Sequence, residues 1–137
     1  MVEFLLLNDF SGDMLKRIAG FYIAAKWISP DDDTAFLLPA LKNSFLVAGA
    51  FADGVIIGSA RVLSDGVSDA YIQDVVVDPE CRGQGVGRGL IELLTGELRR
   101  RQIDWIGLVG EPGTENFYRK LKWQEQRGCT LWNAPQS

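Results

Sequence analysis

The segment that most constrains this sequence is an apolar run, a proline turn and a glycine-rich stretch in direct succession, residues 75–89. Three valines at 75–77 are typical of a buried strand, and Asp78 and Pro79 end it. Glycine then stands at positions 83, 85, 87 and 89, and leucines at helical spacing follow. Glycine permits positive φ and close approach to a ligand, and a helix start offers unpaired N–H groups. The segment therefore predicts a site for a phosphate-bearing ligand.

Two common nucleotide-binding patterns do not fit this segment. A P-loop needs Lys and then Ser or Thr after its last glycine, but Gly87 is followed by Arg88 and Gly89. A dinucleotide fingerprint needs its third glycine one residue later than it stands here, and an acidic residue at the end of the next strand. Asp104 instead stands at the start of that strand. The ligand therefore belongs to another class of phosphate compound.

The same loop resembles the signature of the GCN5-related N-acetyltransferase (GNAT) family. That signature is Arg or Gln, two residues, Gly, one residue, then Gly or Ala, after a strand ending in Val-x-Pro. Arg82, Gly85 and Gly87 occupy its three places. Residues 116–123 are similar to the family's later Phe-Tyr-x-x-Leu-Gly-Phe helix end, about thirty residues further on. Two matches in the right order support the resemblance more strongly than either alone.

The resemblance implies an α/β GNAT fold. We expect a mixed central sheet of six to seven strands, with an antiparallel meander followed by a splayed parallel pair, and about four helices on both faces. With 137 residues, 47% of them hydrophobic, the chain can bury one core, so a single domain over residues 1–137 is expected.

Hydrophobic periodicity and turn residues predict the order of the elements. A helix beginning at Ser29-Pro30 is expected because Ser can cap, Pro suits the first turn and three aspartates follow. The expected elements are a strand at 2–7, a helix through 15–23, a helix at 30–42, three antiparallel strands within 44–77, a helix after the loop, a strand at 105–109 parallel to 71–77, a fourth helix, and closing strands at 123–126 and 129–132.

The resemblance also implies acetyl-CoA as the acyl donor. Its pantetheine arm would pair like a short strand with the backbone of Val75 and Val77, and its pyrophosphate would meet N–H groups of residues 82–87. Arg88 either adds charge near the phosphate or is an ordinary exposed helix residue. The expected cofactor-binding residues are Val75, Val76, Val77, Arg82, Gly83, Gln84, Gly85, Val86, Gly87, Arg88, Asn116 and Tyr118.

Acyl transfer to an amine needs a base, a stabilised oxyanion and a proton for the departing thiolate. The resemblance places Tyr118 at the cofactor sulfur as general acid, although this ring also suits plain packing of its helix. A backbone N–H at Val76 is the expected oxyanion donor. Asp74 and Glu111 are the candidate bases, and Asp74 could equally bind a backbone N–H or cap a bulge.

Two residues depart from the family pattern. Glu111 stands where many members have Asn, so that contact with the pantetheine arm is in doubt. Lys122 stands where Gly is usual, so it must adopt a left-handed conformation or end the helix differently. We therefore expect an N-acetyltransferase in which a primary amine attacks acetyl-CoA directly in a ternary complex; the alternative is a non-catalytic acyl-CoA-binding or regulatory module.

Composition limits the remaining functions. The net charge of −4 argues against nucleic-acid binding, and the Arg99–Arg101 run is expected to be a solvated helix end. The chain has no histidine and two cysteines, so no metal site is expected, and Cys81 is expected to be structural rather than an acyl-carrying nucleophile. We expect a cytoplasmic protein without membrane contact that forms a homodimer. The acceptor is a small-molecule amine or a protein amino group.

Several aromatic side chains are candidates for an acceptor pocket, although core packing explains most of them equally well. Trp27 is the exception among them, because it precedes an expected helix cap where the chain should reach the surface. The candidates are Trp27, Phe36, Phe51, Trp123 and Trp132.

Overall fold

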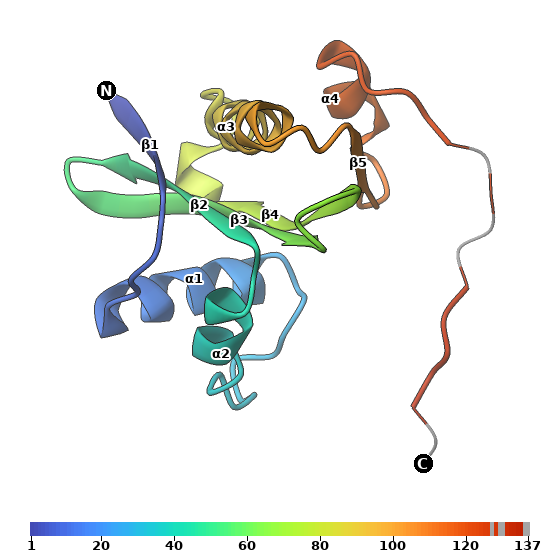
Figure 1. The fold of residues 1–137 in the computed structure, drawn as a ribbon. Helices are drawn as coiled ribbons and strands as arrows, with labels where there is room; N and C mark the ends of the chain where they lie inside the picture. The colour runs from blue at the N-terminus through green and yellow to red at the C-terminus, as the bar shows by residue number, and fades with distance from the viewer. Residues whose placement is uncertain (127, 129–130, 136–137) are drawn as a thin grey trace.

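The computed structural model describes residues 1–126, 128 and 131–135, and is a five-stranded sheet between two helical layers (Figure 1). The strands follow one another across the sheet in chain order, antiparallel except for the last pair. The elements are β1 (Val2–Leu6), α1 (Gly12–Ala24), α2 (Leu37–Lys42), β2 (Leu46–Ala52), β3 (Val55–Ser64), β4 (Asp69–Val77), a 3-10 turn (Pro79–Cys81), α3 (Val86–Arg100), β5 (Trp105–Leu108) and α4 (Glu115–Lys120).

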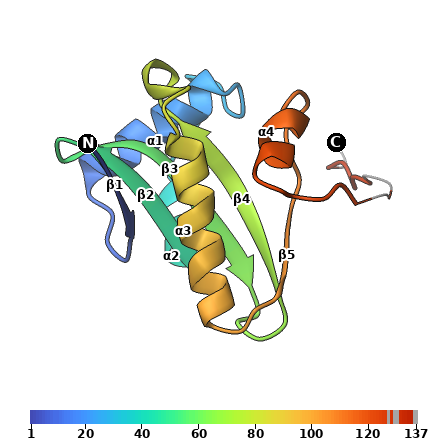
Figure 2. The ribbon, with the colours of Figure 1, turned by 90° about the horizontal axis from the view of Figure 1, so that it is seen from above.

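The sheet separates two apolar cores. On one face, α3 buries Leu90, Leu94 and Leu98 completely against small and branched side chains of β2, β3 and β4. On the other, α1 and α2 bury Ile18 and Leu41 against Val47 and neighbouring strand residues. Figure 2 shows α3 lying along the strands of its face. Strand alternation accounts for both layers, because successive side chains point to opposite faces.

The meander, the helix after the loop and the parallel final strand are confirmed, but fewer strands are present than expected. The described residues form five strands rather than six to seven. The expected strand at 123–126 is absent, and β5 is the edge of the described sheet. The other expected closing strand, 129–132, lies partly outside the described residues. Of that range the structure describes Leu131 and Trp132, which are highly exposed and outside any strand.

The predicted helix at 30–42 is wrong in its first half. Only Leu37–Lys42 is helical, and the preceding residues form turns held by aspartate side chains. The Ser29 N–H donates to Asp32 Oδ2 at 2.7 Å, and the Ala35 N–H donates to Asp33 Oδ1 at 2.9 Å. Short carboxylates compete for nearby backbone N–H groups, so here they stabilise turns instead of capping a helix.

A bulge in β4 sets the geometry of the rest of the sheet. Arg61 pairs with Gln73 and Ser59 pairs with Val76, so one residue of β3 opposes both Asp74 and Val75. Asp74 has φ of 55°, a left-handed conformation that Asp tolerates better than most residues. The extra residue reverses the alternation, so that Ile72 packs on the α3 side but Val76 packs on the α1 side.

The parallel pair is splayed, as expected. Hydrogen-bonded pairing of β4 with β5 runs from Asp69 opposite Trp105 to Ile72 opposite Leu108 and then stops. β4 continues to Val77, while β5 ends at Leu108. In the described part of the chain, the last part of β4 therefore has no strand partner on its β5 side.

Close packing of α3 on β1 requires glycine at one position of the helix. A Cβ at Gly89 would lie 2.1 Å from Phe4 Cζ, whereas a Cβ at Gly96, further along the same helix, would meet nothing within 4 Å. We expect Gly89→Ala to lower the free energy of unfolding by about 1–3 kcal/mol through overpacking. Urea denaturation followed by circular dichroism measures this change.

Gly96→Ala is the matched control, because it makes the same chemical change at an open helical site. It should raise the free energy of unfolding by about 0.5–1 kcal/mol, since alanine loses less conformational freedom than glycine on folding. Equal effects of the two variants would contradict the tight contact between Phe4 and α3.

Candidate active site

The glycine-rich loop has the backbone conformation that its sequence predicts. Gly83 has φ of 76°, and Gly85, the residue before the first turn of α3, has φ of 79°. A Cβ at either position would meet nothing within 4 Å. The need for glycine there is therefore conformational rather than steric.

The backbone N–H groups at the start of α3 face away from any protein acceptor. The first helical bond runs from the Gly89 N–H to the Gly85 carbonyl at 3.0 Å. Among the described residues, no hydrogen bond is donated by the N–H groups of residues 83–88. Unpaired N–H groups at the positive end of a fifteen-residue helix form an anion-binding site.

An arginine on α1 holds the beginning of this loop in place. The Asp78 carboxylate accepts the Glu80 N–H at 3.0 Å and an Arg17 N–H at 3.3 Å. Arg17 also donates from Nε to the Ile56 carbonyl at 2.8 Å. Sequence reasoning missed Arg17, because its partner lies sixty-one residues away and no local pattern indicates the contact.

The three expected valines lie on the open stretch of β4 beside the loop. Val75 and Val77 pack their side chains toward the α3 core, and Val76 is buried in the other core. Their side chains are therefore core residues, as expected. Their backbone borders the gap that the splayed strands leave. On that side no strand of the described sheet pairs with them, although β3 pairs with β4 on the other side.

The α4 helix brings Tyr118 to the same end of β4. The Phe117 ring lies 3.4 Å, and a Val77 methyl 3.8 Å, from the place a Cβ would take at Gly87, so α4 rests on the start of α3. Tyr118 packs edge-on against Phe117 and Trp123, with ring centroids 4.9 and 6.0 Å apart. Burial raises the pKa of the Tyr118 phenol. The group therefore stays protonated at neutral pH, as an acid must.

Asp74 lies at the bulge and is paired with an arginine. Its Oδ2 accepts the Arg61 Nε–H at 2.7 Å, and Arg61 Nη1 lies 3.4 Å from Ser44 Oγ. Burial, with a smaller contribution from the negative charge of Asp74, raises the pKa of Tyr22. Asp74, Arg61 and Tyr22 therefore form a polar cluster at the α1 and α2 face of the sheet, which sequence reasoning did not identify.

The remaining expected contacts are exposed. Glu111 follows β5 and is exposed, and its backbone carbonyl accepts the Thr114 N–H at 3.1 Å. Asn116 Oδ1 accepts from Arg119 at 3.0 Å. Arg88 pairs with Glu92 one helical turn later, at 2.7 Å. Lys122 has φ of 67°, so it adopts the left-handed conformation expected for a residue in a glycine position.

Four further expected residues surround or form the loop itself. Arg82 and Gln84 are exposed, Val86 is buried beneath the loop, and Cys81 is a half-buried free thiol packed against the α3 core. The site therefore combines the loop, the open edge of β4 and helix α4, which carries Tyr118, at one end of the sheet (Figure 2). Asp74 lies one residue before the three valines.

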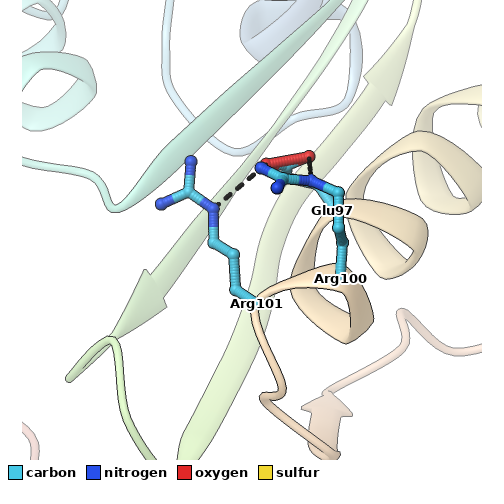
Figure 3. Close-up of polar contacts among 3 residues, drawn as sticks. All are labelled: Glu97, Arg100 and Arg101. Carbon is cyan, nitrogen blue, oxygen red and sulfur yellow. Dashed lines mark hydrogen bonds and ion pairs between the residues drawn. The ribbon is translucent and has the colours of Figure 1, made fainter.

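The arginine run at the end of α3 belongs to a separate, internally paired cluster. Figure 3 shows Glu97 between Arg100 and Arg101, with both guanidinium groups bound to its carboxylate. Hydrogen bonds, first from Arg100 and then from Arg101, lower the pKa of Glu97 to about 2. Arg101 also lies over the Phe45 ring at 5.2 Å. This supports the expectation of a solvated helix end.

Among the described aromatic candidates, burial separates core residues from surface ones. Trp27 is half-buried and packs on Tyr22 with ring centroids 5.2 Å apart, and Phe51 and Trp123 pack against the two cores. Phe36 is exposed, as is Trp132. No helix in the described ranges is both long enough and apolar enough to cross a membrane.

A splayed parallel strand pair beside a helix start with unpaired N–H groups defines a mixed α/β domain with a place suited to an anion at one end of its sheet. The model of the Acetyltransferase (GNAT) family matches residues 13–123, and the chain belongs to this family of acetyltransferases, which use acetyl-CoA. A predicted acetyltransferase from Clostridium acetobutylicum, solved with acetyl-CoA, has the same fold, with a TM-score of 0.74 and 22% identity. The alignment covers 97% of this chain and 96% of that one.

Curated relatives match about three fifths of the chain. Serotonin N-acetyltransferase 2, chloroplastic, of Oryza sativa subsp. japonica is 43% identical over 86 residues, 60% of this chain and 43% of that protein. A histone acetyltransferase of Glycine max is 40% identical over 96 residues, 62% of this chain and 42% of that protein. The chain spans less than half the length of each. These two relatives are similarly identical to this chain, yet their names give different acceptors, serotonin and histones.

Proposed function

We propose that this chain transfers an acetyl group from acetyl-CoA to a primary amine. The observation that carries the proposal is the row of unpaired N–H groups at residues 83–88, which lies beside the unpartnered end of β4. Phosphate suits the first feature, and an amide-bearing arm that pairs like a strand suits the second. Family membership makes acetyl-CoA the ligand that has both parts.

Residues 82–87 would hold the pyrophosphate, with Arg88 able to exchange Glu92 for phosphate because both side chains are exposed. The backbone of Val75 and Val77 would pair with the pantetheine amides. Asn116 and Tyr118, on α4, would border the arm on the side of the gap opposite β4. The residues present thus offer partners for the pyrophosphate and for the amides of the pantetheine arm.

Acetyl-CoA supplies the activated acetyl thioester, and the chain's residues handle the protons and charge. A protonated Tyr118 is suited to donate to the departing thiolate, because burial keeps it neutral. The proposed oxyanion donor is a backbone N–H of the open stretch of β4, at Val75 or Val77. The expected choice, Val76, pairs with Ser59 of β3, and strand alternation turns its N–H toward β3 rather than toward the gap. Asp74 and Glu111 are the candidate bases that deprotonate the amine; one is held by Arg61 and the other is exposed.

The decisive experiment measures CoA released from acetyl-CoA against a panel of polyamines, amino sugars, arylalkylamines and peptides. Turnover with at least one amine class, and saturable acetyl-CoA binding by calorimetry, is the expected result. Binding without turnover on any amine would favour the non-catalytic module instead. Absence of binding at millimolar acetyl-CoA would overturn both readings of the site.

Tyr118→Phe tests the proposed general acid. Removing the hydroxyl leaves the ring packing intact, so kcat should fall roughly 10²–10⁴-fold. The dissociation constant of CoA, measured by calorimetry, should change little. Burial raises the pKa of the phenol above its ordinary value of 10.0. In the unchanged protein, we therefore expect deprotonation of Tyr118 to reduce activity only in the strongly alkaline range and not near neutral pH. Unchanged turnover in this variant would remove Tyr118 from the mechanism.

Cys81→Ala tests direct transfer against an acyl-enzyme route. Cys81 is beside the loop, half-buried and packed against the core, and no histidine exists in the chain to activate it. The variant should keep most of its turnover. Loss of turnover in a folded variant that still binds CoA would indicate a covalent intermediate on this thiol.

A further inference from the structure

Among the described residues, no element covers the sheet face opposite α3 over its last strands. Alternation places Leu63 of β3, Tyr71 of β4 and Trp105 of β5 on this face, because their neighbours Val62, Ala70 and Ile106 pack toward α3. The exposed fractions of Tyr71 and Trp105 are 45% and 49%. In Figure 1, α1 and α2 lie under the other end of the sheet. Two large aromatic rings thus face solvent side by side.

These two rings pack against each other and form one exposed aromatic surface, here called the aromatic platform (Tyr71 and Trp105). Their centroids are 5.3 Å apart with the planes tilted by 58°. The Trp105 ring also folds over Gly107, two residues further along β5, and a Cβ there would lie 2.6 Å from its ring carbons. Glycine at 107 therefore lets the indole lie along the strand, toward the splayed end.

The platform ends where the two strands begin to separate. Tyr71 pairs with Gly107, and the next pair, Ile72 with Leu108, is the last before the gap. Gln73 follows on the same face as Tyr71 and is exposed, and the bulge at Asp74 comes next. Two strand residues span about 7 Å, so the distance from the Tyr71 ring to the start of the gap is that of a short carbon tether.

We propose that the aromatic platform binds the ring of an arylalkylamine acceptor and directs its amine past Gln73 to the gap. The proposal rests on the proposed acetyltransferase function and names the acceptor class for it. Flat rings stack well on a tilted aromatic pair, and a chain of net charge −4 attracts a cationic amine. The donor loop lies at the start of α3, so donor and acceptor reach the gap from opposite faces, as direct transfer requires.

The first test compares phenethylamine with cyclohexylethylamine, which has the same tether and no aromatic ring. Calorimetry on the protein saturated with CoA, where no reaction occurs, gives both dissociation constants. Phenethylamine should bind roughly tenfold more tightly. Equal affinity for the two amines would overturn the proposal, whether or not the protein acetylates either of them.

Three variants locate the binding. Trp105→Ala and Tyr71→Ala each remove one ring, and Gly107→Ala leaves both rings but places a methyl group where the indole lies. Each should weaken phenethylamine binding about tenfold and raise its KM, while kcat and acetyl-CoA affinity change little. Val55→Ala, at a comparably exposed apolar side chain at the start of β3, is the control and should change nothing. Circular dichroism confirms the fold of each variant.

The outcomes separate this proposal from the proposed function. Amine turnover with phenethylamine KM and dissociation constant unchanged in all three folded variants would keep the acetyltransferase and reject the platform. Tryptophan-dependent phenethylamine binding without any turnover would keep the platform and reject the acetyltransferase. If Trp105→Ala instead abolishes a dimer in light scattering and leaves amine affinity unchanged, a second copy occupies this face and the proposal fails.

Discussion

The bulge at Asp74 is the constraint on which the candidate site depends. One extra residue in β4 reverses which side chains face each core, and β5 has lost contact with the strand by that point. Beyond the bulge, β4 still pairs with β3, but among the described residues it has no strand partner on its β5 side, and the start of α3, which also has free N–H groups, lies beside it. Asp74 holds the distortion in two ways, through a left-handed φ that it tolerates and through its ion pair with Arg61.

The two faces of the sheet have different tasks in this arrangement. On the α3 face, close packing at Gly89 and Gly58 brings the helix onto the sheet, and its first turns thereby rest against β1 and β3. On the other face, α1 reaches across through Arg17 to hold Asp78 at the entry of the loop. That same face is left bare over β4 and β5, where Tyr71 and Trp105 lie. One face is thus covered by α3, with the proposed donor loop at its start, and the other is open over β4 and β5, where the proposed acceptor site lies.

The positions at which the sequence departs from the family pattern are accommodated locally. Lys122 takes the left-handed conformation that glycine would adopt more easily, at a cost of about 1–2 kcal/mol. Glu111 projects where it meets solvent rather than core. Neither residue lies in the loop or in the gap, so both family features of the site are preserved despite the two changes.

The sequence by itself determined the local features: the glycine-rich loop, the meander with its turns, α3 and the parallel return strand, because each depends on periodicity or on residues close in the chain. It failed at residues 30–36, where aspartates bind turn N–H groups, and in the strand count over the described residues. The tertiary structure alone decided the pairs Arg17 with Asp78 and Arg61 with Asp74, and the platform of Tyr71 and Trp105. Those contacts join residues on different elements, and which elements become neighbours is decided by packing across the whole sheet.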